Sequence, residues 1–449
     1  MKKLLLLLLL PLGFGVSAQS LYWDTVATGF SAESTGIGQF SYAGTNVIWG
    51  YGTDGTGGQE QLRVWTKSVD GGVTWTSGII NVGSDFLAIG SISAVSATTA
   101  YVSVFPDGAA QGGIWRTVDG GVTWTKQPSA SYNTGTDSFA NIVHMWPDGL
   151  TGWSQGDPAG GCFEMYTTVD GGANWTRVPC GAAIPAHQLE EYGYTHNFAV
   201  EGNTIWFGTN KGRMYKSLDK GLTWTVSQTP ITDFGGASVS GNYDFENQTN
   251  GILISSNFDY FRTTDGGANW VGDFPEGNFR NYNIAYVPGT TNTYVSTGED
   301  FDGARGSSFS NDGGATWFDI NSVDIDDPIN NGSALAFADE THGVAGGFTA
   351  SSTSAGAFRW KGTFLANVDF QSGKAFTAYP NPTNGVLEVA GKNIVNVAVY
   401  DILGKQVVNN NYTSLNSVNL NLGSLNAGVY MVKVTNDAGA TSTIKVVKQ

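Results

Sequence analysis

The sequence predicts an all-β protein in which a seven-bladed β-propeller precedes a small immunoglobulin-like β-sandwich. Three observations lead to this prediction. One eight-residue motif occurs six times, the segments between its copies have the pattern of short strands and turns, and the last part of the chain is rich in alternating strands but lacks the motif. A motif repeated at a period of this size indicates a closed radial array of small sheets.

The repeated motif has the composition of a tight turn. Its first copy reads Ser68-Val69-Asp70-Gly71-Gly72-Val73-Thr74-Trp75. The glycines allow positive φ, the carboxylate can accept backbone N–H groups of its own turn, and the tryptophan offers an apolar face to a neighbouring sheet. We therefore expect a structural role, not a catalytic or metal-binding one, for the six aspartates, which lie 49, 51, 49, 46 and 47 residues apart: Asp70, Asp119, Asp170, Asp219, Asp265 and Asp312.

These copies resemble the Asp-box, or BNR repeat, of sialidase-like and photosystem-assembly-factor-like β-propellers, over roughly residues 20–365. In that family the boxes lie on outer-strand hairpins, away from the ligand face, so the resemblance implies a fold and leaves the activity open. Sialidases of the family often carry a Phe-Arg-Ile-Pro motif and bind substrate with three arginines. The motif is missing here, and only scattered residues such as Arg213, Arg280 and Arg305 remain for such a triad. The sequence therefore disfavours sialidase activity.

The last blade lacks a box. The next copy is due near residue 359, where no Asp-Gly turn occurs, although residues 334–337 and 342–348 still have strand patterns. Residues 21–26 resemble the segment that follows each box. We predict that this N-terminal strand completes the seventh blade beside residues 356–363, since ring closure removes exposed sheet edges.

The N-terminal segment predicts export, and the net charge disfavours two classes of partner. Residues 1–18 have the basic start, short apolar run and small-residue cleavage site of a secretory signal peptide. No other segment is long enough to predict a transmembrane helix. The net charge of −16 disfavours nucleic acids and anionic membrane surfaces as partners. The predicted domains are the signal peptide at 1–18, the propeller at 19–365 and the sandwich at 366–449.

The chain has two cysteines, Cys162 and Cys180, whose midpoint is the third box turn. Antiparallel pairing about that turn would place them within disulfide distance, and export favours oxidation. Two buried free thiols are the alternative. The four histidines lack zinc-ligand spacing, so we predict neither a metal site nor a cofactor.

The C-terminal region has about seven short alternating strands, the pattern of a β-sandwich. Two of them are expected as separate strands at residues 386–389 and 395–400. Three motifs within it, at residues 379–385, 399–405 and 425–430, resemble those of the type A sorting domain of the type IX secretion system. The resemblance covers roughly residues 370–449. It implies export by that machinery across the outer membrane of a Bacteroidetes-type bacterium, followed by release or attachment to the cell surface.

Candidate functional residues lie in glycine-rich, acidic loops on the face that propellers use for ligands. Three loops contribute carboxylates, and residues 190–197 combine carboxylates, aromatic rings and a histidine, the mixture that suits sugars. The predicted ligand-binding residues are Asp54, Asp157, Glu190, Glu191, Tyr192, Tyr194, His196, Glu299 and Asp302.

The sequence favours binding of an extracellular glycan or glycoprotein through these loops. A glycoside hydrolase is the alternative from another class, because glycoside hydrolysis needs two opposed carboxylates. Asp157 with Glu190 or Glu191 is the candidate catalytic pair. A protein-assembly role is a third hypothesis, and whether the protein is an enzyme stays open.

Overall fold

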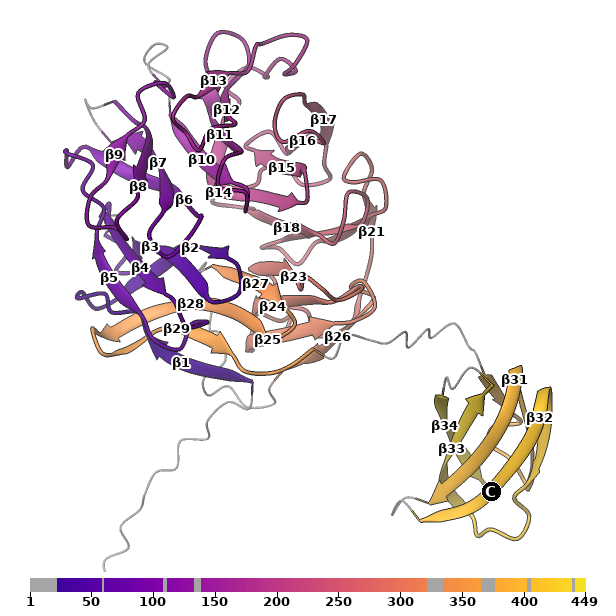
Figure 1. The fold of residues 1–449 in the computed structure, drawn as a ribbon. Coiled ribbons are helices and arrows are strands. Elements are labelled where there is room, and N and C mark those ends of the chain that lie inside the picture. The colour runs from indigo at the N-terminus through magenta and orange to yellow at the C-terminus, as the bar shows by residue number, and fades with distance from the viewer. Residues whose placement is uncertain are drawn as a thin grey trace, which may run out of the picture. The chain divides into compact units, whose positions relative to one another are not determined.

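The computed structural model describes residues 22–58, 60–107, 111–132, 139–320, 334–364, 376–401, 405–437 and 441–449. The expected signal peptide lies outside these residues. The chain divides into two compact units, Met1–Ala366 and Asn367–Gln449. In the described parts of both units all regular elements are β-strands, as Figure 1 shows.

The first unit is a β-propeller. Its described strands form seven sheets, which Figure 1 shows side by side around one axis. Five of them are four-stranded meanders in chain order: β2 (Thr35–Ala43), β3 (Val47–Asp54), β4 (Val64–Ser68) and β5 (Thr76–Ile79); β6 (Leu87–Ala94), β7 (Ala100–Pro106), β8 (Gly113–Thr117) and β9 (Thr125–Lys126); β10 (Ala140–Met145), β11 (Gly152–Pro158), β12 (Phe163–Thr168) and β13 (Thr176–Arg177); β14 (Gly193–Glu201), β15 (Thr204–Thr209), β16 (Arg213–Ser217) and β17 (Thr225–Gln228); β18 (Gly241–Phe245), β19 (Gly251–Ser255), β20 (Tyr260–Thr263) and β21 (Val271–Gly272).

The other two sheets contain a strand from outside the simple meander. One has the order β22 (Glu276–Gly277), β26 (Thr316–Asp319), β25 (Arg305–Ser310), β24 (Tyr294–Glu299) and β23 (Asn283–Tyr286). The other has the order β1 (Trp23–Ala27), β29 (Ser354–Trp360), β28 (His342–Ser351) and β27 (Leu335–Asp339).

The innermost strands are joined to each other by side chains. Because neighbouring sheets do not share a backbone ladder at the axis, inward N–H groups of one sheet need acceptors from the next. Ser41 Oγ accepts the N–H of Ala94 at 2.9 Å, and Ser91 Oγ accepts that of Val143 at 2.8 Å. Short hydroxyl side chains therefore join the inner strands of successive sheets.

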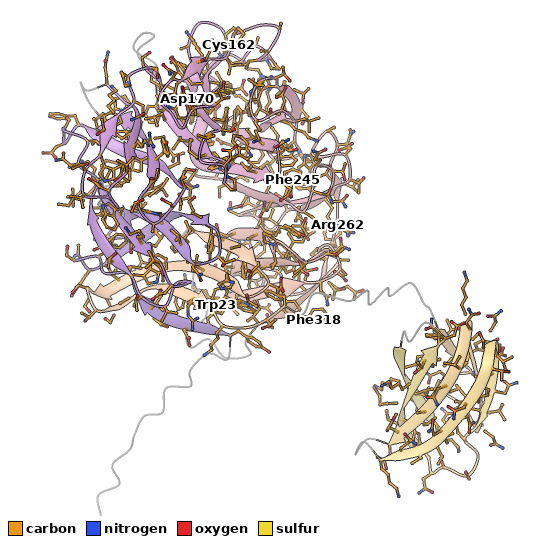
Figure 2. The ribbon with its side chains drawn as sticks, viewed as in Figure 1. Trp23, Cys162, Asp170, Phe245, Arg262 and Phe318 are labelled. Atoms are coloured by element: carbon orange, nitrogen blue, oxygen red, sulfur yellow. A yellow bond between two sulfur atoms is a disulfide. The ribbon has the colours of Figure 1, made fainter. Side chains whose placement is uncertain are left out.

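Each box aspartate is bound within its own turn. In the first box, Asp70 Oδ1 accepts the N–H of Thr74 at 2.9 Å, while Ser68 Oγ donates to Oδ1 at 2.8 Å and accepts the N–H of Gly72 at 2.8 Å. In all six copies Oδ1 accepts the N–H four residues later. The turn joins the third strand of its sheet to the fourth, near the outer side of the ring, where Figure 2 labels Asp170.

Aromatic side chains fasten one sheet to the box turn of the next. Trp65 Nε1 donates to Gly121 O at 3.2 Å, and Tyr101 OH donates to Gly171 O at 2.6 Å. Trp206 Nε1 and Tyr260 OH make the corresponding bonds to later boxes, at 2.9 Å each. The box turns are therefore acceptors for the preceding sheet as well as hairpin connections.

The predicted closure of the ring is confirmed. β1 pairs antiparallel with β29, from Trp23 opposite Trp360 to Ala27 opposite Gly356. Trp23, labelled in Figure 2, is fully buried. Arg359 and Lys361 each bind the Asp24 carboxylate at 2.8 Å, so the closing strand is held by backbone, aromatic and ionic contacts together.

Cys162 and Cys180 form a disulfide with a Cα–Cα distance of 5.7 Å. They flank the hairpin of β12 and β13, whose regular pairing ends at Tyr166 opposite Arg177. Figure 2 places Cys162 at the outer part of the ring. The bridge lies just beyond the paired residues of its hairpin.

The described part of the second unit has fewer strands than the sequence pattern indicates. Its described strands are β30 (Phe376–Tyr379), β31 (Val386–Asp401), β32 (Gln406–Asn421), β33 (Gly428–Asn436) and β34 (Thr441–Lys448). β31 and β32 each continue through register shifts, such as that between Ala390 and Ile394, where the sequence suggested separate strands. Bulges bend these strands without ending them, and residues from both halves of β31, such as Leu387 and Val399, belong to one hydrophobic core.

Shortening the buried side chain of Trp23 in β1 should destabilise the propeller. Trp23→Ala removes a fully buried indole, and we expect the free energy of unfolding to fall by roughly 3–5 kcal/mol. Urea unfolding followed by intrinsic fluorescence would measure the loss. Thr25→Ala, at an exposed position of the same strand, is the control; equal stability of both variants and the parent would contradict the closure.

The box turns should make stability depend on acidic pH. The hydroxyl and N–H of Thr123 lower the pKa of Asp119 from 3.8 to about 2. A carboxyl whose pKa is lowered by folding stabilises the fold above its unfolded pKa, and this contribution is lost as pH falls through the folded value. We expect the melting temperature to fall between about pH 4 and about pH 2, and to fall less in Asp119→Asn, whose side chain does not titrate. An identical acid profile for parent and variant would refute this assignment.

Candidate functional site

The candidate residues lie at one end of the strands. Asp54, Asp157 and Glu299 stand at the ends of β3, β11 and β24, the second strands outward from the axis. Residues 190–197 lead into and begin β14, an innermost strand. Because neighbouring strands are antiparallel, second strands end where innermost strands begin. These segments therefore share the face opposite the box turns, which we call the mouth face.

A cavity of about 610 Å³ lies along the innermost strands β2, β14, β18, β23 and β27. Its wall is rich in carboxamides and aromatic rings. These groups can exchange hydrogen bonds with hydroxyl or amide groups of a ligand and cover its apolar faces. The carboxamide residues of the wall are Gln39, Asn197, Asn242, Asn281 and Asn283, and its aromatic residues include Phe40, Tyr194 and Tyr286.

The inner strand β14 bulges at this cavity. Gly193 pairs with Thr209, but the next pair is Phe198 with Phe207, so residues 194–197 lie outside the regular ladder. His196 has a φ of 49°, a left-handed conformation that is uncommon for a residue with a Cβ atom. Such local backbone strain is found at binding sites more often than elsewhere. All four bulge residues line the cavity.

His196 joins two distant parts of the ring. Its Nδ1 lies 3.0 Å from the hydroxyl of Tyr51, a residue of β3, and the ring centroids are 6.4 Å apart. Desolvation by the surrounding protein lowers the pKa of the His196 imidazole from 6.5 to about 4, although part of the residue is exposed to water. The imidazole is therefore neutral at physiological pH and can donate or accept one hydrogen bond at each nitrogen.

Asp157 supports the start of the bulge. Its Oδ1 accepts Asn141 Nδ2 at 2.8 Å and the N–H of Gly193 at 3.0 Å. Gly193 is the last paired residue before the bulge. Asp157 therefore joins β10, β11 and β14 and fixes where β14 leaves the regular ladder.

Glu191 is committed to an internal ion pair. Its Oε2 lies 2.7 Å from Arg213 Nη1 and accepts the N–H of Gln188 at 2.7 Å, while its Oε1 accepts Thr209 Oγ1 at 2.8 Å. Its side chain is fully buried and that of Arg213 is 10% exposed. Both carboxylate oxygens are thus occupied, and this geometry gives no support to a role in proton transfer.

Glu190 differs from its neighbour. It is exposed and has a φ of 58°, and its carbonyl accepts Asn210 Nδ2 at 2.9 Å. Of the three predicted catalytic carboxylates, Glu191 belongs to the buried ion pair with Arg213, while Asp157 and Glu190 do not.

Two tyrosines lie at the start of the bulge, Tyr192 just before it and Tyr194 as its first residue. Tyr192 and Tyr194 meet edge to face with centroids 5.5 Å apart, and Tyr192 is 43% exposed. Tyr194 OH donates to Asp233 Oδ1 at 2.5 Å. Burial, followed by this bond, raises the pKa of Tyr194, so Tyr194 is anchored while Tyr192 offers its ring to solvent.

The other predicted acidic residues serve their own loops. Asp54 accepts the N–H groups of Thr56 and Glu60 at 2.8 and 3.0 Å. Glu299 pairs with Arg305 at 2.8 Å, and the N–H of Asp302 donates to Asp300. These bonds hold separate loops in shape and do not bring the three carboxylates to the bulge of β14.

The three scattered arginines are also separated by their partners. Arg213 pairs with Glu191, Arg305 pairs with Glu299, and Arg280 pairs with Asp300 and Asp319 at 2.9 and 2.8 Å. Each guanidinium is neutralised within its own sheet or connecting loop. They form no triad that could bind a carboxylate ligand.

Sequence reasoning missed the carboxamides of the cavity. Asn242 and Asn283 stand at the starts of β18 and β23, where they bond to each other at 3.0 Å. It also missed Asp244, whose pKa is raised from 3.8 to about 7 by burial in the same wall. The available signal was an asparagine near the start of β18 and of β23, at a position otherwise expected to be apolar.

Across the described ranges, no group of three or more His, Cys, Asp or Glu side chains is arranged to hold a metal ion. Nor does any helix long and apolar enough to cross a membrane occur in them.

Residues 377–449 match the family model of the secretion system C-terminal sorting domain. This match confirms the predicted type IX sorting domain and identifies the chain as a secreted or cell-surface protein.

The propeller is similar to photosystem assembly proteins. A 108-residue segment is 33% identical to the photosystem II assembly lipoprotein Ycf48 of Synechococcus sp. (strain CC9902), covering 24% of this chain and 27% of that protein. Two solved structures have a TM-score of 0.50 and cover 76% of this chain: "YCF48 bound to D1 peptide", 16% identical over 96% of its chain, and YCF48 from Cyanidioschyzon merolae, 14% identical over 98%. At these identities the structures support the fold alone.

The ion pair of Glu191 should be needed for stability. Glu191→Gln leaves the buried guanidinium of Arg213 without its counter-charge, and removing one partner of a buried pair costs roughly 3–5 kcal/mol. The neighbouring change Glu190→Gln, at an exposed side chain, should alter the free energy of unfolding by less than about 0.5 kcal/mol. Chemical unfolding of both variants tests the difference; equal effects would disprove the structural role of Glu191.

Proposed function

Since the chain is a β-propeller joined to a type IX sorting domain, we propose that it is an exported binding protein whose mouth face holds an extracellular glycan or the glycan of a glycoprotein. The observation that carries this proposal is the bulge of β14 at residues 194–197, which extends into a cavity of about 610 Å³. A strained segment in a polar cavity is a common form of ligand site.

The chemistry of the cavity suits a neutral, hydroxyl-rich ligand. Carboxamides such as Asn197 and Asn242 can both donate and accept. The exposed ring of Tyr192 beside the cavity residue Tyr194 can cover the apolar face of a sugar.

A binding role fits this site better than hydrolysis. The glycosidase mechanism needs two carboxyl groups free to act on either side of the scissile bond. Glu191 is held by Arg213, and Asp157 is bonded to Asn141 and to the backbone of Gly193. A hydrolase would have to use Asp157 and Glu190 after rearrangement of these bonds.

A peptide ligand is the second candidate. The solved structure of "YCF48 bound to D1 peptide" has a similar fold, and carboxamides also pair well with peptide groups. In this alternative the protein would bind a polypeptide segment at the same mouth face, in keeping with an assembly role.

Retention on immobilised polysaccharides and glycoproteins would test the proposal with the full secreted protein. We expect retention on at least one glycan, and a loss of at least about tenfold in affinity for Tyr192→Ala and His196→Ala, since aromatic anchors at binding sites commonly contribute more than 1 kcal/mol. Phe274→Ala, which removes a ring that is 96% exposed elsewhere, should bind like the parent.

Three other outcomes would change the assignment. Equal retention on a glycoprotein before and after enzymatic deglycosylation would favour the peptide alternative. Release of soluble sugar that is abolished in Asp157→Asn would identify a hydrolase. Unchanged binding in both mouth-face variants would place the ligand elsewhere on the protein.

A further inference from the structure

The gaps between neighbouring sheets are filled in a repeated way beside the box turns. Three residues before the box aspartate, the third strand carries Lys67, Arg116, Lys216 or Arg262 in four of the copies. Where this residue is lysine, its ammonium group reaches toward the next sheet. These lysines show which chemistry the gaps accept.

The gap between the β2–β5 sheet and the next sheet is filled by a lysine and a tryptophan. Lys67 Nζ donates to Ala97 O at 2.9 Å and to Gly120 O at 3.1 Å, both in the next sheet. The same ammonium lies 4.5 Å from the ring centroid of Trp49, which is the cross-strand partner of Lys67. An alkylammonium group and an indole ring thus fill this gap together.

The gap beyond the β14–β17 sheet repeats the arrangement. Lys216 Nζ donates to Gln248 O at 2.9 Å and lies 5.6 Å from the ring of Trp206, its cross-strand partner. Burial lowers the pKa of this lysine, as it does for Lys67.

The gap beyond the β18–β21 sheet lacks both of these groups. The cross-strand partner of Arg262 is Ile252, which is much smaller than tryptophan. Arg262 itself forms an ion pair with Asp273, which directly follows β21 of the same sheet. Figure 2 shows Arg262 at the outer part of the ring.

A cavity of about 420 Å³ remains in this gap. Its wall includes Ile252, Arg262 and Gly313. Gly313 is the sixth-box residue that corresponds to Gly120, whose carbonyl accepts the Lys67 ammonium. The cavity therefore occupies the place that a lysine and a tryptophan fill in the other two gaps.

The charges around the cavity favour a cation. Four carboxylates line it against one guanidinium, Arg262. Aliphatic contact is available from Val271, which is 70% exposed. An ammonium group on a short alkyl chain would match both features. The lining carboxylates are Glu246, Asp265, Asp273 and Asp312.

We propose that this cavity binds a primary alkylammonium group, supplied by a lysine side chain of a partner protein. The incoming lysine takes the position that Lys67 and Lys216 occupy in their own gaps. Because the cavity lies beside the box turns, at the strand ends opposite the mouth face, this binding is independent of the proposed glycan site.

Binding of Nα-acetyl-lysine methylamide to the full secreted protein tests the proposal, with Nα-acetyl-norleucine methylamide as the uncharged probe of similar shape. Ligand-observed NMR titration should show binding of the lysine probe and at least about tenfold weaker binding of the norleucine probe. Ile252→Trp combined with Arg262→Lys restores both groups that fill the other two gaps, so this double variant should abolish binding of the lysine probe.

Glu246→Gln removes one charge from the cavity wall and serves as a second variant if the double variant fails to fold. We expect about tenfold weaker binding of the lysine probe, because a hydrogen bond to a charged group contributes enough for such a factor. Glu33→Gln, an exposed carboxylate outside the cavity, should bind like the parent. Equal binding of both probes, or undiminished binding in Glu246→Gln, would overturn the proposal.

Discussion

The contact between an aromatic side chain and the box turn of the next sheet is the interaction on which the ring depends. Neighbouring sheets share few backbone hydrogen bonds, so each must be held by side chains at a fixed place. Trp65 donates to Gly121 O, and Tyr260 donates to Gly314 O. A Cβ atom on Gly121 would lie 2.6 Å from the Trp65 ring, and one on Gly314 would lie 2.0 Å from the Tyr260 hydroxyl. In these two boxes the second glycine is thus required by the approaching ring as well as by its positive φ.

The contacts that hold neighbouring sheets together at the box turns explain why the two faces of the propeller differ. On the box face each box aspartate is bonded within its own turn, as Asp70 is to the N–H of Thr74. On the mouth face the loops differ in length and composition from sheet to sheet, and polar side chains such as Asn242 face a cavity. A scaffold held at one end of its strands leaves the other end free to vary, which is where ligand sites on such folds are commonly built.

The sequence was sufficient for the features that depend on local chemistry. The box turns and the strand that closes the ring could be predicted, because the repeated turn motif and the absence of a seventh copy can both be read from the linear sequence. The ion pair of Glu191 with Arg213 and the bulge at His196 could not, since both depend on contacts between segments that only the fold brings together. The C-terminal unit shows the same limit: the shift between Ala390 and Ile394 bends one strand where the sequence suggested a break.

Ring closure has a consequence for the order in which the protein is made. Asp24 and Arg359, which join the two ends of the propeller, are 335 residues apart in the chain. The first strand must therefore wait, with an unpaired edge, until nearly the whole propeller has been synthesised. The sorting domain follows β29, the strand that pairs with β1. Every chain that carries the sorting domain therefore also carries both of these strands. A chain that terminates before β29 has an open ring and no sorting domain. The order of the two units therefore restricts the sorting domain to chains in which every strand of the propeller has been synthesised.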